Sequence, residues 1–293
     1  MNCNICPREC GADRETENGI CGCGEKIHIS RAAPHFWEEP PISHKNGSGT
    51  VFFAGCNLKC VFCQNGEISR CETGKEVTAE RLYEIFWELK ATGVHNINLV
   101  TPTHYTEQII PVLKKAKAEG FSLPIVWNSG GYEKAETIKM LNGLVDVYLP
   151  DLKYIRPETA FRYSGAKDYF EHAWAAIDEM VKQRGNAVIH RGTMRRGVIV
   201  RHLILPGHGE ESKEIIKYLH SRYGNSIYIS IMNQYTPMER VKDTHPEIYR
   251  RVTEAEYDEV VEFAKLIGVE NAFVQDGDTA KESFIPPFDN QGV

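Results

Sequence analysis

From residue 50 onward, the chain alternates short runs of apolar and β-branched residues with longer segments of mixed polarity. Runs of this length and composition are typical of buried β-strands. Six strands are predicted in this way, at residues 50–54, 96–100, 124–128, 145–149, 198–203 and 226–231. Because the runs are almost continuously apolar, they indicate a parallel sheet that is covered on both faces.

The longer segments between these runs have the apolar spacing of amphipathic helices. In the first of them, Leu82, Ile85, Phe86 and Leu89 fall on one helix face, and Gly93 is a stop signal. Helices are predicted at residues 78–93, 106–119, 132–141, 168–184, 210–223 and 254–267. Alternating strands and helices predict an α/β fold with right-handed crossovers. Six strands suit a doubly wound sheet or a partial (β/α)6 TIM-like barrel, and we predict the barrel.

The N-terminal segment differs from the rest, because it is rich in Cys, Gly and Pro and has no clear period. A short segment with so little apolar material does not fold alone without metals or disulfides. We therefore predict two domains: a cysteine-rich metal-binding extension at residues 1–45, and a core barrel with a C-terminal helical segment at residues 46–293.

Charge and composition exclude several classes of protein. The 293 residues are 42% apolar and carry a net charge of −6, whereas a nucleic-acid-binding protein needs a basic face. No apolar run approaches the roughly 18 to 20 residues that span a bilayer, and the first residues lack the apolar core of a secretory signal. We expect a cytoplasmic protein with neither a membrane nor a nucleic acid as partner.

All nine cysteines lie within the first 71 residues, which excludes a disulfide framework spread over the fold and favours metal or redox chemistry. Cys56, Cys60 and Cys63 form a C-x3-C-x2-C array directly after the first predicted strand. Tetrahedral zinc and four-iron clusters usually take four ligands, so this array leaves one place open. A structural zinc site would need a second Cys or His pair, and Cys71 has no partner beside it.

Polar residues follow the other predicted strands. The carboxyl ends of parallel strands are where α/β enzymes place their chemistry. The candidates at these ends are Thr101, Thr103, His104, Asn128, Ser129, Asp151, Lys153, His208, Asn233 and Gln234. Arg201 lies inside the fifth strand, where an arginine that faces the barrel lumen needs an anion or a buried acid as partner.

The stretch GCNLKCVFCQN at residues 55–65, with Phe62 before the third cysteine, resembles the cluster motif of the radical S-adenosylmethionine (SAM) superfamily. Further stretches between about residues 3 and 240 resemble the branch related to pyruvate formate-lyase-activating enzymes: INLVTPTHYTEQI, IVWNSGGYE, VDVYLPDLKY, YSGAKDY, RHLILPG and SIMNQYTP. The resemblance implies a [4Fe-4S] cluster on Cys56, Cys60 and Cys63, with SAM at the fourth iron. It also implies reductive cleavage of SAM to a 5′-deoxyadenosyl radical, which abstracts a substrate hydrogen.

The resemblance leaves the substrate open. A glycyl-radical enzyme is one possible protein substrate, and modification of another peptide or a small molecule is the alternative. In either case the resemblance implies a reductant such as flavodoxin or ferredoxin. A non-catalytic iron–sulfur or zinc protein, with Cys71 as the fourth ligand, is a further alternative.

Several residues match motifs of the related activases, which implies that they bind the cofactor. They are the aromatic Phe62 of the cysteine array, the strand-end residues Asn128, Ser129, Asp151 and Lys153, and Arg201 inside a strand. Asp151 could hold a ribose diol or a cation, and Lys153 or Arg201 could hold a carboxylate. The structural alternatives are a turn cap for Asp151 and an ion pair for Arg201.

The chain departs from the superfamily pattern at residues 101–104. Where the wider superfamily carries a Gly-Gly-Glu-like motif, this sequence has Thr101, Pro102, Thr103 and His104, without a carboxylate. Hydroxyl and carbonyl oxygens could accept hydrogen bonds from the SAM ammonium instead. The alternative for His104 is a cap of the next helix.

A second cysteine set lies in the N-terminal extension. Cys3, Cys6, Cys10 and Cys21 follow a C-x2-C-x3-C-x10-C pattern, and four thiolates in a segment with little core predict a shared metal. The spacing fits both zinc and an auxiliary [4Fe-4S] cluster. It assigns no role to Cys23 or Cys71.

Overall fold

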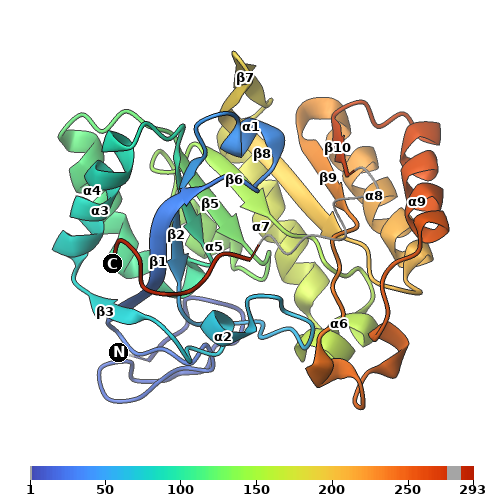
Figure 1. Ribbon diagram of the computed structural model, residues 1–293, viewed down its shortest axis with the longest axis horizontal. Helices are drawn as coiled ribbons and strands as arrows, with labels where there is room; N and C mark the ends of the chain where they lie inside the picture. Colours follow the sequence, from blue (N-terminus) through green and yellow to red (C-terminus); the bar gives the residue numbers. More distant parts are fainter. Residues whose placement is uncertain (1, 276–284) are drawn as a thin grey trace.

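The computed structural model describes residues 2–275 and 285–293, and its centre is a parallel sheet. The strands of this sheet are β2 (Ser48–Phe53), β4 (Ile97–Val100), β5 (Ile125–Ser129), β6 (Val147–Pro150), β8 (Thr193–Leu203), β9 (Tyr228–Met232) and β10 (Ala272–Val274). The first six correspond to the six predicted strands, which are confirmed. Figure 1 shows them curving as an open, partial barrel.

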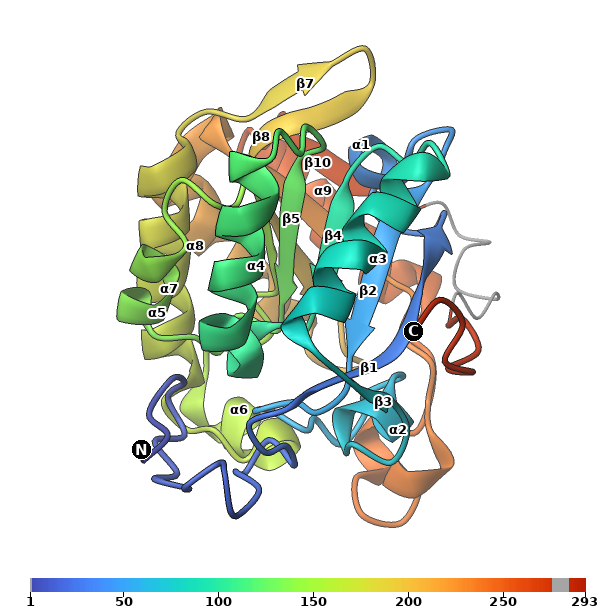
Figure 2. The ribbon, with the colours of Figure 1, turned by 90° about the vertical axis from the view of Figure 1, so that its left-hand side faces the viewer.

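Helices connect the parallel strands and cover the outer face of the sheet (Figure 2). They are α3 (Ala79–Ala91), α4 (Thr106–Ala118), α5 (Ala135–Met140), α6 (Pro157–Ser164), α7 (Tyr169–Arg184), α8 (Gly209–Tyr223) and α9 (Glu254–Leu266). Thr78 caps α3 by accepting a hydrogen bond from the Arg81 amide, and Thr253 forms a capping box with Glu256 at the start of α9.

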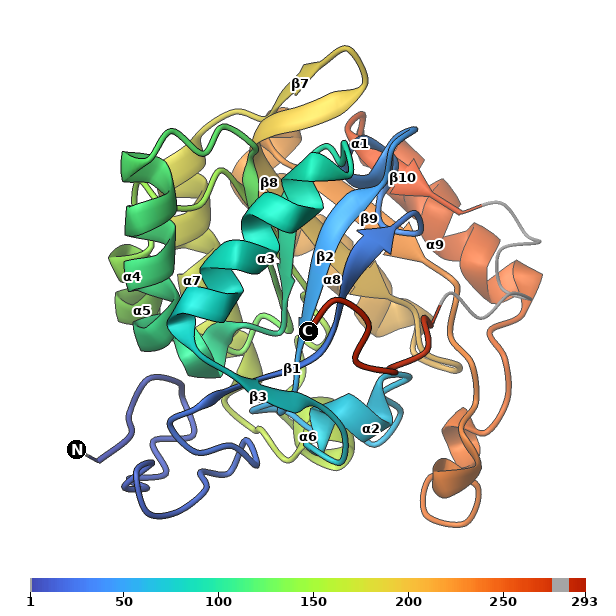
Figure 3. The same ribbon diagram turned by 60° about the vertical axis from the view of Figure 1, so that its left-hand side comes forward.

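Antiparallel strands extend the sheet at one edge, where the sequence predicted none. β1 (Ile27–His35) pairs with β2, and β3 (Lys75–Val77) pairs with β1. Figure 3 shows the C-terminal residues running beside β1, where the Ala32 amide donates to the Gln291 carbonyl. Because β1 lies within residues 1–45, the extension and the barrel share one sheet. Their division into two domains remains a proposal.

Further short elements were also missed. α1 (Pro40–Ser43) and the strand β7 (Val188–His190), which forms a hairpin with β8, lie at the amino ends of the parallel strands (Figure 1). α2 (Gly66–Ser69), α6 and the cysteine-rich segment lie at the opposite, carboxyl end.

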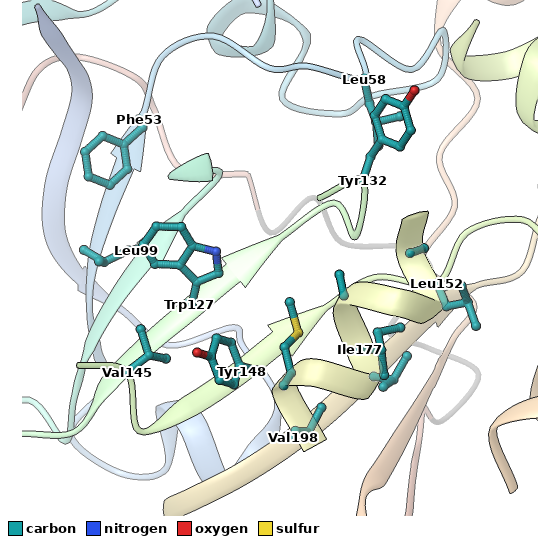
Figure 4. Packing of buried hydrophobic residues seen from close by; sticks show 14 of the residues in the cluster. Phe53, Leu58, Leu99, Trp127, Tyr132, Val145, Tyr148, Leu152, Ile177 and Val198 are labelled. Carbon is teal, nitrogen blue, oxygen red and sulfur yellow. The ribbon is translucent and has the colours of Figure 1, made fainter. Parts of the chain in front are cut away.

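Side chains alternate between the two faces of each strand. Leu99, Trp127, Tyr148 and Val198 point outward into the main core, and Figure 4 shows them with Ile177 of α7. The residues next to them in sequence point inward. Ile42 of α1 packs there against apolar residues of β5, β6 and β8, namely Val126, Val147, Leu149, Met194 and Ile199. Ile42 thus closes the lumen at the amino ends of the strands.

The parallel sheet with its covering helices confirms the predicted α/β fold and partial barrel. Among the described helices, none is long and apolar enough to cross a membrane.

Candidate functional site

The three cysteines of the array lie on the loop between β2 and α2, at the carboxyl end of the parallel strands. Cys56, Cys60 and Cys63 are all partly exposed. Gly55 starts the loop with a φ of 88°, and a Cβ at this position would come within 2.2 Å of Cys23 Sγ. The turn into the cysteine loop therefore requires glycine.

The three thiols lie within electrostatic reach of one another. Burial, together with Cys60 and Cys63, raises the pKa of Cys56 to about 12. Burial and then Cys60 raise the pKa of Cys63, while the nearby Lys153 ammonium opposes this rise. Neighbouring thiols disfavour one another's ionisation, and a cation bound between them favours their thiolate forms.

This donor set fits a cluster better than a single ion. Within residues 2–275 and 285–293, no three His, Cys, Asp or Glu side chains are placed to hold one metal ion. A four-iron cluster gives each thiolate its own iron atom, so its ligands need not converge on one point. Three thiols on one loop, with Lys153 beside them, suit such a cluster.

Ser164, at the end of α6, donates a hydrogen bond of 3.0 Å to Cys60 Sγ. A donor to a ligand sulfur stabilises the electron-rich reduced cluster and so raises its potential. We expect Ser164→Ala to lower the midpoint potential of the reconstituted cluster in an EPR-monitored redox titration. Ser164→Thr, which keeps a hydroxyl, serves as the control. Equal potentials in the Ala and Thr variants would contradict a role for this hydrogen bond.

Phe62 packs within the core of the cysteine loop. Its ring lies edge-on to Tyr154, Tyr163 and Tyr235, with centroid distances of 6.5, 6.3 and 6.0 Å. The side chain is 6% exposed. Phe62 therefore anchors the loop between Cys60 and Cys63 to the barrel.

A buried polar network occupies the inner face of the sheet beneath the cysteine loop. Arg201 Nε donates to Asp151 Oδ1 at 2.8 Å, and Arg201 Nη2 donates to Asn128 Oδ1 at 2.7 Å. Lys153 Nζ donates to the other Asp151 oxygen at 2.5 Å. The structure thus brings together four of the predicted site residues from three neighbouring strands. Arg201 has the buried acid that its place in the strand requires.

Two carboxylates of this network were missed by the sequence analysis. Glu38 Oε2 accepts from Arg201 Nη1 at 3.3 Å, and Glu38 and Glu39 both lie on the connection between β1 and α1. Burial raises the pKa of Glu38, and it raises the pKa of Glu39 to about 7. Asn98 lies beside Glu38 and lowers its pKa, but neither amide atom of Asn98 completes a hydrogen bond. An adjacent acidic pair before a proline pair was the one available signal in the sequence.

Glu133 is a third missed carboxylate, and it organises the loops after β4 and β5. It accepts hydrogen bonds from Thr103 at 2.8 Å, from Trp127 Nε1 at 2.9 Å and from Ser129 at 2.5 Å. The hydroxyls of Thr103 and Ser129 are therefore engaged with Glu133. Thr101 is half-buried with a φ of 58°, which is uncommon for a β-branched residue and marks a tight turn after β4.

His104 is buried away from the polar network, where its Nε2 lies 2.8 Å from the Ala54 carbonyl oxygen. This contact ties the loop after β4 to the end of β2. Burial lowers the pKa of His104 to about 3. The imidazole is therefore neutral at physiological pH, and it supports the loop that begins the cysteine array.

The neutral His104 predicts acid sensitivity. The folded chain binds its proton only near pH 3, whereas the unfolded chain binds it near pH 6.5, so stability is lost as the pH falls between these values. In this range the wild type should lose up to about 1.4 kcal/mol per pH unit more than His104→Gln. Urea unfolding of the metal-free protein at pH 7.5, 6 and 5 measures the difference. Parallel pH profiles for the two proteins would contradict a buried neutral histidine.

The predicted N-terminal cysteine set is drawn together in the structure. Cys3 interacts electrostatically with Cys10 and Cys21, and Cys6 interacts with Cys3 and Cys21. A Cβ on Gly19 would lie 3.2 Å from Cys10 Sγ and 3.5 Å from Cys21 Sγ, so these two sulfurs crowd the same glycine. The fold therefore places the four thiols in one neighbourhood, although among the described residues no three of these side chains converge on a single metal ion.

Cys23 and Cys71 form a thiol pair between the extension and the cysteine loop, and Cys23 also interacts with Cys21 of the N-terminal set. Their sulfurs are 3.4 Å apart, and Cys23 Sγ also lies 3.3 Å from the Ala54 carbonyl oxygen. The Cys56 amide donates to the Cys21 carbonyl at 3.1 Å. The extension is thus packed directly on the start of the cysteine array.

Sequence comparison links this site to a known family. The radical SAM superfamily model matches residues 50–219, which is more than half of the chain. An uncharacterised protein of Methanocaldococcus jannaschii is 32% identical over 270 residues, covering 90% of this chain and 74% of that protein.

Several relatives carry functional names. The pyruvate formate-lyase-activating enzyme of Clostridium pasteurianum is 29% identical over 178 residues, covering 58% of this chain and 66% of the enzyme. A putative glycyl-radical enzyme activating enzyme of Haemophilus influenzae is 31% identical over 123 residues, covering 39% of this chain and 45% of that protein. The chain thus spans less than two thirds of the length of both.

Solved structures share the fold at low sequence identity. HydG, a maturase of the [FeFe]-hydrogenase, gives a TM-score of 0.53 with 17% identity over 75% of this chain and 49% of HydG. Streptococcus suis SuiB, solved with the precursor peptide SuiA, gives 0.52 with 13% identity over 75% of this chain and 46% of SuiB. These similarities support the partial barrel described above.

Proposed function

This chain is an enzyme of the radical SAM superfamily, in the branch related to pyruvate formate-lyase-activating enzymes, and on that premise we propose that it cleaves SAM reductively to abstract a substrate hydrogen. The observation that carries the proposal is the cysteine loop. It presents Cys56, Cys60 and Cys63 at the carboxyl end of the barrel, directly above a buried network of charged side chains.

The proposed chemistry depends on the fourth iron of the cluster, which no cysteine of the array binds. When bound, a [4Fe-4S] cluster with SAM at its fourth iron would supply the one electron needed to cleave the sulfonium into methionine and a 5′-deoxyadenosyl radical. The chain's own part is to hold the cluster with three thiolates, to orient SAM, and to keep water out. Phe62, packed among three tyrosines, excludes water beside the loop.

The charged network supplies the polar contacts that SAM needs. We assign Lys153 and Arg201 to a carboxylate, because both present fixed cations on the inner face. Asp151 holds both cations in place and can also accept from a ribose hydroxyl. Asn128 fixes the outer end of the Arg201 guanidinium.

The loops after β4 and β5 complete the proposed SAM site. Thr101, Thr103 and Ser129 offer backbone and hydroxyl oxygens to the SAM ammonium, and Glu133 positions the last two. His104 contributes indirectly, because it supports the backbone from which the cysteine loop starts.

The proposal also covers the substrate, the reductant and the second metal centre. The named relatives favour activation of a glycyl-radical enzyme, with the hydrogen taken from a glycine of that protein. Modification of another peptide or of a small molecule is the alternative. A reductant such as flavodoxin or ferredoxin supplies the electron. Cys3, Cys6, Cys10 and Cys21 hold a second metal centre, either zinc or an auxiliary iron–sulfur cluster.

The test is anaerobic reconstitution with iron and sulfide, reduction with dithionite, addition of SAM, and quantification of 5′-deoxyadenosine. The proposal expects product, together with a change in the EPR spectrum of the reduced cluster when SAM is added. No product and no spectral change would reject SAM chemistry. That result would favour the non-catalytic iron–sulfur or zinc alternative.

Arg201→Ala is expected to reduce SAM cleavage by about 10- to 100-fold while the cluster remains assembled, because the cation assigned to SAM is removed. Asp151→Asn keeps the shape of the network, and it should weaken cleavage through mispositioned Lys153 and Arg201. Arg196→Ala, on the exposed part of β8, is the matched control. Wild-type cleavage in both network variants would remove them from the SAM site.

A further inference from the structure

The inner face of the barrel carries more buried acid than base. The side chains of Glu38, Asp151, Arg201 and Lys153 are 10%, 14%, 15% and 18% exposed, so solvent reaches the network only narrowly. Glu39 is 8% exposed. Glu38, Glu39 and Asp151 thus share two cations on this face, which leaves one carboxyl group without a cation of its own.

The excess of carboxyl groups over cations lies at the end of the network farthest from Lys153, where Glu38 and Glu39 are adjacent. Arg201 directs its short hydrogen bonds to Asp151 and Asn128, at 2.8 and 2.7 Å. Glu38 accepts longer contacts of 3.3 Å from Arg201 and Asn128 and also interacts with the Asn98 side chain, whereas Glu39 Oε2 is buried without any hydrogen bond. A buried carboxylate that accepts no hydrogen bond destabilises the fold. A ligand with a hydrogen-bond donor would therefore bind favourably at this end of the network.

Asn98 is an independent sign of a ligand at this place. It is fully buried on the inward-facing side of β4, beside Glu38, and both atoms of its amide lack a hydrogen-bond partner. Native proteins leave few buried polar groups unpaired, and each such group needs an explanation. Glu39 Oε2 and Asn98 Oδ1 are thus buried acceptors without a donor, and they lie beside Glu38 on two separate segments.

We propose that Glu38, Glu39 and Asn98 bind the primary ammonium group of the substrate. The three N–H donors of an ammonium match three acceptor oxygens, and its positive charge balances the surplus carboxylate. The assignment rests on the proposed function, because it identifies the substrate class as an amine, such as a lysine side chain or a small aminoalkyl compound.

The position of this site suits a substrate that reaches toward the cysteine loop. Contacts run continuously from Glu38 through Arg201 and Asp151 to Lys153, which interacts electrostatically with Cys60. Ile42 closes the lumen at the amino ends of the strands. An ammonium held by Glu38 would therefore leave the rest of its carbon chain directed to the reacting end of the barrel.

The test measures binding, not turnover, in the full-length reconstituted protein. Four probes of equal length are compared by saturation-transfer NMR and calorimetry: n-butylammonium, n-butylguanidinium, butanoate and n-butanol. We expect n-butylammonium to bind and the anion and the alcohol not to bind. Glu38→Gln and Glu39→Gln should each weaken binding of n-butylammonium by about 10- to 100-fold. Glu136→Gln, on the exposed first turn of α5, should not.

Each outcome decides the assignment. No binding of n-butylammonium to the wild type, equal binding by all variants, or selective binding of n-butylguanidinium would overturn the ammonium site. If either Gln variant does not fold, Asn98→Leu replaces it, and unchanged affinity in that variant would equally overturn the site. SAM cleavage is measured on the same wild-type sample. Ammonium binding without 5′-deoxyadenosine would reject the proposed function alone, and cleavage without ammonium binding would reject this site alone.

Discussion

Cys60→Ala is expected to abolish assembly of the cluster and to reduce SAM cleavage by more than about 100-fold, because even outer-shell partners of metal ligands cost 10- to 100-fold. The array has only three thiols, so the loss of one leaves no spare ligand on the loop. The Ser164 hydroxyl, now without its sulfur acceptor, cannot replace it. Iron and sulfide content, the EPR spectrum after reduction, and 5′-deoxyadenosine measured by chromatography report the loss.

Cys71→Ala is the matched control, because Cys71 lies eight residues beyond Cys63 and packs against the same core. It should keep both the cluster and SAM cleavage. Cys3→Ala serves as a second control, which removes metal from the extension and leaves the array intact. Loss of the cluster in Cys71→Ala would make Cys71 the fourth ligand and would support the non-catalytic alternative.

The barrel was predictable because its strands are short apolar runs between helices of clear period. The positions directly after the predicted strands indicated Asp151, Lys153 and Asn128 as site residues. The parallel register of β5, β6 and β8 explains why these residues meet Arg201. Asp151 and Arg201 are 50 residues apart in sequence, yet they form a bridge between β6 and β8. The place of Arg201 in a strand predicted an anion or a buried acid as its partner, and the structure pairs it with the buried Asp151.

The elements and residues that the sequence analysis missed depend on contacts between distant segments, and no local sequence pattern reveals such contacts. β1 has an irregular apolar pattern, because it lies between β2 and the short strand β3 and is partly covered by the C-terminal residues. Glu38 lies beyond this strand, on a segment without recognisable period, and only the pairing of β1 with β2 brings it under the barrel. Glu133 follows a double glycine and resembles an ordinary surface carboxylate until Trp127 is seen to face it.

Glu133→Ala is expected to destabilise the protein by about 3 to 5 kcal/mol, because three buried donors lose their common acceptor. The hydroxyls of Thr103 and Ser129 can rotate toward other groups, whereas the Trp127 indole N–H cannot. Such a loss is a large part of the roughly 5 to 15 kcal/mol that stabilises a typical domain. Urea unfolding of the metal-free protein measures the free energy of unfolding.

Glu133→Gln separates the hydrogen bonds of this residue from its charge. Burial raises the pKa of Glu133, and the groups that oppose this rise, Ser129, Trp127 and Thr103, are all uncharged. The neutral amide can still accept from Trp127 and Thr103, so Glu133→Gln should lie within about 1.5 kcal/mol of the wild type, the scale of one hydrogen bond. Glu136→Ala, three residues further on and exposed, should change stability by less than about 0.5 kcal/mol. Equal destabilisation by the Ala and Gln variants would show that the charge of Glu133, and not its hydrogen bonds, holds the two loops together.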